Sequence, residues 1–275
     1  MNVHLGPIVL QPWHIFALLS GLVAIAAGWW FGRRLGLGIS DPWLDMALVA
    51  LAAGRVVFIL QWFAAYQDSP WSIFDIGDGG INGWASIVSA LIVAAWRLKS
   101  RPVLWRPIVA GSFSGLLLWS GFSLSGLGQP ATALVPAVQL LDISAKSVRL
   151  APPEDGRALV INLWATWCPP CQREMPNLAR AQKSHPEVQF LFVNEGESLH
   201  TVQQYLHLVP FRLENVLVDD GSLISKAMDS SALPMTLIYG RDGRLAYSHI
   251  GMISEAVLEM QLARCKCGLQ HLGAI

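Results

Sequence analysis

The apolar residues of this chain follow two different patterns, which change near residue 130. Before that point they form long runs, each close to the roughly 20 residues that a helix needs to cross a bilayer core. After it, short β-branched runs alternate with amphipathic stretches, as in a sheet flanked by helices. We therefore predict an all-α transmembrane region of about four helices followed by an α/β domain. The predicted spans are Trp13–Phe31, Trp43–Tyr66, Ile81–Leu98 and Pro107–Leu127.

The C-terminal part predicts a central mixed sheet with helices on its faces. A lead-in around Val138–Leu150 precedes a buried strand at 158–164 and a helix at 174–183. The sequence Gly-Arg-Asp-Gly favours a hairpin turn between the last two strands. Further strands are predicted at Val188–Asn194, Val216–Val218, Met235–Tyr239 and Leu245–Ile250, and further helices at Leu199–Leu208, Ser222–Met228 and Ser254–Arg264.

These patterns divide the chain into three parts. We expect a transmembrane anchor at 1–127, a linker at 128–137 and the α/β domain at 138–275. The linker is small, uncharged and contains Gly and Pro, as flexible connections do. Because it is short, the domain should work close to the membrane surface.

Composition and charge agree with a membrane protein. The 275 residues are 53% hydrophobic and only 14% charged. The formal net charge is zero, so a nucleic-acid partner is not expected. Basic residues follow the first and third predicted spans, whereas acidic residues follow the second. Since basic loops stay in the cytoplasm, the N-terminus and the α/β domain should both lie outside.

Two cysteines two residues apart are the candidate chemistry of the domain. Cys168 and Cys171 flank two prolines where the strand at 158–164 gives way to a helix. Free N–H groups and the helix dipole at such a corner favour a thiolate. We expect Cys168 to be the exposed nucleophile of a dithiol/disulfide couple and Cys171 to be the shielded resolving thiol. A structural disulfide or half of a zinc site is the alternative, but the other cysteines lie roughly a hundred residues away and no metal site is predicted.

Glu174 is the candidate proton acceptor for this couple. It lies three residues beyond Cys171, so the two share a helix face. A partly buried carboxylate there could take the proton of the resolving thiol. The alternative is that Glu174 only complements the helix dipole and faces water.

The run WATWCPPC, with the Glu-Met-Pro that follows it, resembles the thioredoxin superfamily, and specifically its membrane-tethered TlpA/ResA/DsbE-like branch. The resemblance extends over roughly residues 138 to 264. It places Asn162 where thioredoxin buries an aspartate, and Leu233-Pro234 where the family keeps a cis-proline. A plain trans proline is the alternative at Pro234. The resemblance implies that Trp167, Leu233 and Pro234 contact the substrate, with Leu233 pairing its backbone to a substrate strand.

For the whole chain, this resemblance implies a protein thiol-disulfide oxidoreductase without a cofactor. It is expected in a bacterial inner membrane, anchored in the lipid bilayer, with its redox domain on the periplasmic side. Its substrates would be protein thiols and disulfides, for example the haem-attachment cysteines of apocytochrome c, and it would act as a reductant. A disulfide oxidase or isomerase is the alternative direction.

The anchor carries a second, partial resemblance. Gly54-Arg55 and residues 66–84 resemble part of prolipoprotein diacylglyceryl transferase, whose catalytic histidine would fall at Trp84. We interpret the region as a degenerate relic used as an anchor. A lipid-modifying enzyme with an attached redox domain is the alternative function. Arg55 would bind an anionic lipid headgroup or pair with a polar group of a neighbouring span.

The remaining cysteines leave two questions open. Cys265 and Cys267 are either a second redox pair or unpaired tail thiols, or they bridge to another chain. Residues 1–167 contain no cysteine. Because thiol exchange passes through mixed disulfides, we expect a separate membrane thiol protein to supply the electrons.

Overall fold

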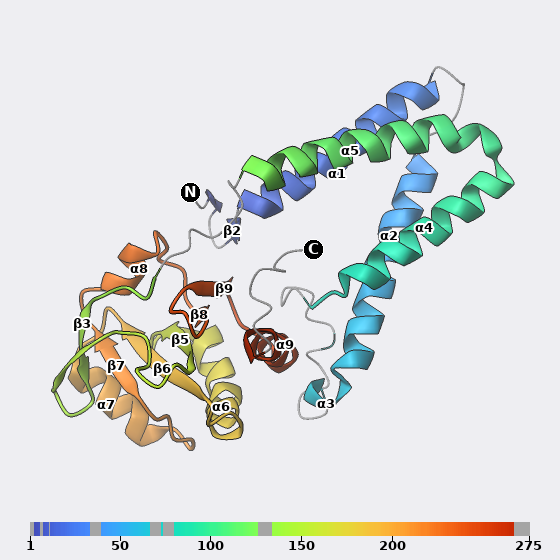
Figure 1. The fold of residues 1–275 in the computed structure, drawn as a ribbon. Coiled ribbons are helices and arrows are strands. Elements are labelled where there is room, and N and C mark those ends of the chain that lie inside the picture. The colour runs from blue at the N-terminus through green and yellow to red at the C-terminus, as the bar shows by residue number, and fades with distance from the viewer. Residues whose placement is uncertain are drawn as a thin grey trace. The chain divides into compact units, whose positions relative to one another are not determined.

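The chain folds into two compact units, one within residues 1–129 and one containing residues 130–275. Figure 1 shows the computed structural model. It describes residues 3–5, 8–10, 12–33, 40–66, 73, 80–125 and 134–266. Each unit is considered by itself below.

The first unit is built from four long helices that pack in two pairs, preceded by a short hairpin. Helix α1 (Pro12–Arg33) packs along α5 (Trp105–Ser125), and α2 (Ser40–Gln61) packs along α4 (Gly83–Ser100) (Figure 1). The short helices are α3 (Phe63–Tyr66) and η3 (Pro102–Leu104), and the hairpin consists of β1 (Val3–Leu5) and β2 (Ile8–Leu10).

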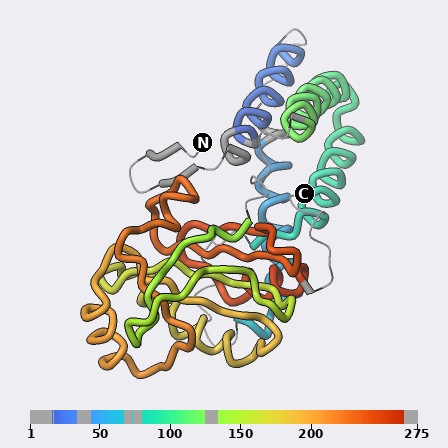
Figure 2. The backbone as a smooth tube through the Cα atoms, turned by 60° about the vertical axis from the view of Figure 1, so that its left-hand side comes forward, coloured from blue at the N-terminus to red at the C-terminus, as the bar shows by residue number. Residues whose placement is uncertain are grey.

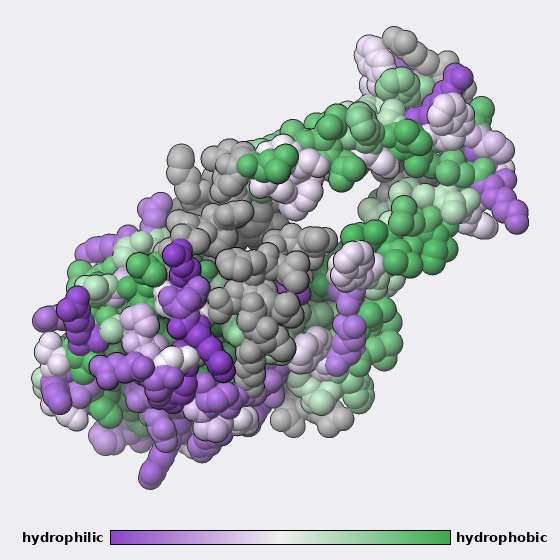
Figure 3. Space-filling model, in the orientation of Figure 1, coloured by the Kyte–Doolittle hydropathy of each residue, from purple (hydrophilic) through white to green (hydrophobic). Residues whose placement is uncertain are grey.

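Large apolar side chains cover the outside of these helices. Leu22, Leu60 and Leu116 are all more than half exposed, and Figure 3 shows hydrophobic surface along the helices. Among the described residues, Leu44–Gln61 and Pro102–Leu124 are long and apolar enough to cross a membrane. Each of the four predicted runs is helical over most of its described residues, but two fall short of that test. The described apolar part of α1 is shorter, and α4 mixes serine, arginine and lysine with its apolar residues.

Polar contacts join α2 to the start of α4. Arg55 is 9% exposed and donates from Nη1 to the carbonyl of Gly80 over 2.8 Å. A side chain at Gly54 would collide with Ser86 on α4, so glycine permits the close approach of the two helices. Asn82 caps α4 by accepting from the N–H of Ala85. Of the two interpretations of Arg55, these contacts favour pairing with a neighbouring segment.

The second unit is a seven-stranded mixed sheet with the strand order β4-β3-β7-β6-β5-β8-β9. Figure 1 shows the sheet with helices around it, and Figure 2 shows the backbone of the same unit from another side. Strands β5, β6 and β7 are parallel, and the outer strands pair antiparallel. The strands are β3 (Gln139–Asp142), β4 (Ser147–Arg149), β5 (Ala158–Trp164), β6 (Val188–Glu195), β7 (Val216–Asp219), β8 (Met235–Tyr239) and β9 (Leu245–Ile250). The helices are α6 (Pro169–Ser184), α7 (Leu199–Leu208), α8 (Leu223–Ala227) and α9 (Glu255–Lys266).

Strand β5 is the centre of this unit and is buried along its whole length. Leu159, Ile161 and Leu163 point into one apolar core, because alternate residues of a strand share a face. Asn162 therefore belongs to the opposite face. This near-continuous apolar run is what a strand covered on both faces requires.

The domain begins earlier than the predicted residue 138. Val135 is buried in the core, and its N–H donates to the carbonyl of Gly243. Leu134 forms a β-bridge with Arg244. The apolar side chain of Val135 gains more by burial than it would as part of a solvated linker. The end of the expected linker is therefore part of the second unit.

Candidate active site

Cys168 and Cys171 form a disulfide at the start of α6. Their Sγ atoms are 2.07 Å apart and their Cα atoms 5.3 Å apart. Cys168 is the N-cap residue: its backbone is extended, and its Sγ accepts from the N–H of Cys171 at 3.3 Å. Pro169 and Pro170 fill the first helical turn, where their missing N–H groups would be unpaired in any case. The strand-to-helix corner predicted from the sequence is confirmed.

Both sulfurs are buried, which corrects one prediction. Cys171 is fully buried as expected, but Cys168, expected to be exposed, is only 3% exposed. The cause is its place as the helix cap, where its sulfur is bonded to that of the fully buried Cys171 and accepts from the N–H of the same residue. Trp167 beside it is 67% exposed. This indole and the exposed Pro169 therefore provide accessible surface next to the disulfide.

Glu174 is buried beneath the couple and is 3% exposed. Its Oε1 accepts from Asn162 Nδ2 at 2.8 Å, and its Oε2 accepts from the N–H of Ile253 at 3.1 Å. Burial raises the pKa of Glu174 to about 7, and the two hydrogen bonds oppose that rise. The alternative in which Glu174 faces water is wrong. The carboxyl is poised to change protonation state near neutral pH.

Asn162 links Glu174 to the neighbouring strand. Its Nδ2 also donates to Thr236 Oγ1 at 3.1 Å, and Asn162 and Thr236 are register partners on β5 and β8. Within the described residues, Asn162 Oδ1 is buried without a hydrogen-bond partner. A protonated Glu174 would present a donor in this region. The amide thus orients the carboxylate and does not compete with it for a proton.

Glu197 holds the loop that leads into Cys168. Its Oε2 accepts from the N–H of Thr166 at 2.7 Å and from Asn194 Nδ2 at 2.7 Å, while Oε1 accepts from Thr166 Oγ1 at 2.5 Å. Gln172 Nε2 in turn donates to the Thr166 carbonyl at 2.5 Å. Sequence reasoning missed Glu197, because only the register of β5 against β6 brings it to this loop.

The Leu233-Pro234 peptide bond is cis, as predicted. Leu163 near the end of β5 pairs with Met235 at the start of β8. Pro234 therefore precedes β8 at the same end of the sheet where β5 continues into the cysteine motif. Leu233 is half-buried and Pro234 buried. The residues that the sequence predicts for the site thus lie at one end of the sheet.

Comparison with known proteins identifies the second unit. Residues 130–262 match the family model described as Redoxin. The chain carries a redoxin domain of the thioredoxin superfamily. Thiol-disulfide oxidoreductase ResA of Halalkalibacterium halodurans is 29% identical over 151 residues, 53% of this chain and 82% of the relative. Sporulation thiol-disulfide oxidoreductase A of Bacillus subtilis is 26% identical over 152 residues, 53% of this chain and 88% of the relative. The chain is accordingly a thiol-disulfide oxidoreductase of the ResA type.

Among solved structures, the redoxin domain is similar to a thiol:disulfide interchange protein of the thioredoxin family from Chlorobium tepidum. That similarity has a TM-score of 0.42 at 21% identity and covers 49% of this chain and 97% of the other. The Redoxin match begins at residue 130. It therefore does not extend to the first unit, whose resemblance to prolipoprotein diacylglyceryl transferase stays a hypothesis.

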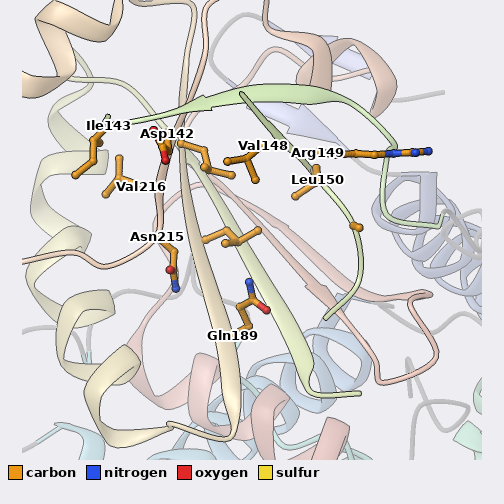
Figure 4. Close-up of a pocket in the computed structure, with 11 residues that line it drawn as sticks. Asp142, Ile143, Val148, Arg149, Leu150, Gln189, Asn215 and Val216 are labelled. Atoms are coloured by element: carbon orange, nitrogen blue, oxygen red, sulfur yellow. The ribbon is translucent and has the colours of Figure 1, made fainter. Parts of the chain in front are cut away.

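A cavity of about 350 Å³ lies at the other end of the redoxin domain's sheet. Figure 4 shows residues from β3, β4 and the beginnings of β6 and β7 around it, with Arg149 extending away from the others. Cys168 follows the end of β5, which runs parallel to β6. The cavity is therefore separate from the disulfide.

Cys265 is buried in α9 as a free thiol. Burial, and secondarily the charge of Asp242, raises the pKa of this thiol, so it stays protonated and weakly nucleophilic. These surroundings do not favour a second redox pair. Cys267 lies outside the described residues.

Proposed function

We propose that this protein is a membrane-anchored reductant of protein disulfides on the extracytoplasmic side, using Cys168 as nucleophile, Cys171 as resolving thiol and Glu174 as proton acceptor. One observation carries the proposal. A disulfide that caps α6 lies one helical turn from a buried carboxyl whose pKa is about 7. Once this disulfide is reduced to the dithiol, the two thiols supply the electrons for a substrate disulfide and the carboxylate supplies a place for the proton.

The reaction starts from the reduced dithiol. The N–H of Cys171 donates to Cys168 Sγ, and the same contact would stabilise the Cys168 thiolate. The thiolate attacks one sulfur of a substrate disulfide. That bond breaks, a mixed disulfide forms with Cys168, and the first substrate thiolate leaves and takes a proton from water.

Glu174 acts in the second half of the reaction. Residues three apart on a helix are neighbours, so its ionised carboxylate can take the proton of the Cys171 thiol directly or through one water. The Cys171 thiolate then attacks Cys168 Sγ and displaces the second substrate thiolate. Two electrons have passed to the substrate. The protein is left with the Cys168–Cys171 disulfide and a protonated Glu174.

The substrate would dock beside the exposed Trp167. Its indole supplies apolar contact area next to the disulfide. The backbone of Leu233, two residues before β8 begins, would pair with an extended substrate segment. Protein substrates in an extended, unfolded form, such as apocytochrome c before haem attachment, suit this arrangement.

The four helices of the first unit would anchor the domain in the bilayer. Their exposed apolar side chains and the charges of the connecting loops support a multi-pass anchor with the redoxin domain outside. A separate membrane thiol protein would return Cys168–Cys171 to the dithiol state.

Trapping of mixed disulfides tests the roles of the two cysteines. Cys171→Ser leaves Cys168 able to attack but removes the thiol that releases the substrate. Mixed disulfides with extracytoplasmic proteins should therefore accumulate in cells and disappear on reduction, as seen on non-reducing gels. Cys168→Ser is the matched control and should trap no partner. Trapping by the Cys168 variant alone would reverse the assignment.

A further inference from the structure

His249, on β9, contacts the segment that holds the Glu174 carboxylate. Its Nε2 lies 3.1 Å from the carbonyl oxygen of Met252. The next residue, Ile253, donates its N–H to Glu174 Oε2. This carbonyl and this N–H belong to one planar peptide unit and point in opposite directions. The histidine and the carboxylate therefore bind the two sides of the same rigid group.

The contacts of His249 fix the position of its proton. The Met252 carbonyl can only accept, so Nε2 must carry hydrogen in both charge states of the ring. In the neutral ring Nδ1 is then an acceptor, and it lies 3.2 Å from the Tyr247 hydroxyl, which donates to it. The Tyr247 and His249 rings also stack, with their centroids 6.2 Å apart. The imidazole is therefore held on two sides.

A hydrogen bond to the carbonyl of a peptide strengthens the N–H of the same peptide as a donor, because linked hydrogen bonds polarise one another. An N–H that binds a carboxylate favours its charged form. Two hydrogen bonds favour the ionised form of Glu174 despite its burial, and the bond from the N–H of Ile253 is one of them. The other comes from Asn162.

We propose that His249 is a positioning residue for Glu174. It holds the Met252–Ile253 peptide so that the N–H of Ile253 is directed at the carboxylate. Glu174 then stays ionised, and able to accept a proton, down to a lower pH. The consequence for catalysis rests on the proposed function, in which that proton comes from Cys171. The contact between His249 and the peptide does not depend on that function.

The side chains of the sheet that surround this contact are mostly uncharged. Thr236 on β8 is the register partner of His249, and Asn162 on β5 is the partner of Thr236. Tyr247 is the titratable neighbour on β9. Between α6 and α9, Arg180 pairs with Glu255, and His185, the C-cap residue of α6, contacts Glu259.

The direct test is a titration of Glu174 in the full chain, held in detergent micelles with the disulfide intact. Carboxyl-labelled glutamate gives the NMR signals, and E174Q identifies that of Glu174. H249F keeps a ring but loses the donor, and should move the Glu174 titration upward by about one pH unit. H249Q, whose amide nitrogen can occupy the place of Nε2, should titrate as the parent does. An unchanged titration in H249F would overturn the proposal.

A measurement on the unmodified protein does not depend on how the variants fold. Nitrogen chemical shifts of His249 above its pKa should show hydrogen on Nε2 and none on Nδ1. Hydrogen on Nδ1 would contradict the contact. The proposed function is tested separately by the exchange rate of E174Q. If that rate equals the parent's, Glu174 is not the proton acceptor, whereas the titration still decides whether His249 positions it.

Discussion

At the scale of single residues, Glu174 couples the stability of the redoxin domain to pH. Its pKa is raised from 4.5 in the unfolded chain to about 7 in the fold. Between these values the folded state holds a proton that the unfolded state has released, so stability must fall as pH rises. The loss amounts to about 3 kcal/mol once pH exceeds the folded pKa. Below pH 4.5 the carboxyl is neutral in both states and the full stability is present.

Glu174→Gln should remove this pH dependence while keeping the shape of the side chain. We expect the variant to be more stable than the parent above pH 7, by up to about 3 kcal/mol, and to differ little below pH 4.5. Urea unfolding of both proteins from pH 4 to 8 measures the difference. The same variant should exchange disulfides more slowly at neutral pH, because the proton acceptor is lost. Parallel stability curves would contradict the raised pKa.

The sequence predicts those site residues whose relation is local. Cys168, Cys171 and Glu174 lie within one helix start, so their spacing alone places them together. His249 and Glu197 act through contacts with segments distant along the chain. Such contacts depend on strand register, which no local pattern encodes. The burial of Cys168 was missed for a related reason, because exposure depends on what packs over the helix cap.

At the scale of elements, the loop between β5 and α6 should depend on Glu197. Glu197→Ala removes the acceptor for both the N–H and the hydroxyl of Thr166. The loop then no longer fixes the position of Cys168, and the exchange rate should fall about tenfold or more. Stopped-flow measurement with a disulfide peptide gives this rate.

Glu197→Gln is the matched control for this loop. Its amide oxygen can accept from the Thr166 N–H and from Asn194 Nδ2. Its NH₂ can donate to the hydroxyl oxygen of Thr166, because a hydroxyl accepts as well as donates. The contacts survive while the charge is lost, so the rate should stay near the parent's. A rate as low as that of the alanine variant would show that the charge of Glu197 matters and not its contacts.

Most elements of the redoxin domain follow from the sequence because each has its own signal. Strand β5 is a bounded apolar run, and the hairpin between β8 and β9 has a glycine with positive φ at Gly243. The helix α6 begins five residues before the predicted 174, since Pro169 and Pro170 suit a first turn as well as a loop. The sequence assigns Val135 to the linker because the Gly and Pro residues near it are typical of linkers and a single valine among them does not indicate burial.

At the scale of the whole molecule, the start of the domain can be tested by truncation. A fragment of residues 130–275 retains Val135 in the core, whereas a fragment of residues 138–275 lacks it. Loss of this buried valine should cost about 1.5–3 kcal/mol of unfolding free energy. Urea unfolding of the two fragments measures the difference. Equal stability would place residues 134–137 in the linker after all.

The absence of cysteine from residues 1–167 separates the roles of the two units. Each electron transfer by thiol exchange needs a sulfur on both partners, so the first unit cannot pass electrons to Cys168–Cys171 by this chemistry. The fragment 130–275 should therefore exchange disulfides in solution at the same rate as the full chain. Full-length protein in vesicles, with a thiol reductant on the opposite side only, should stay oxidised. Adding a membrane thiol transporter to the same vesicles should restore the dithiol, as measured by alkylation of Cys168. Reduction without that transporter would show that the first unit carries electrons by another route.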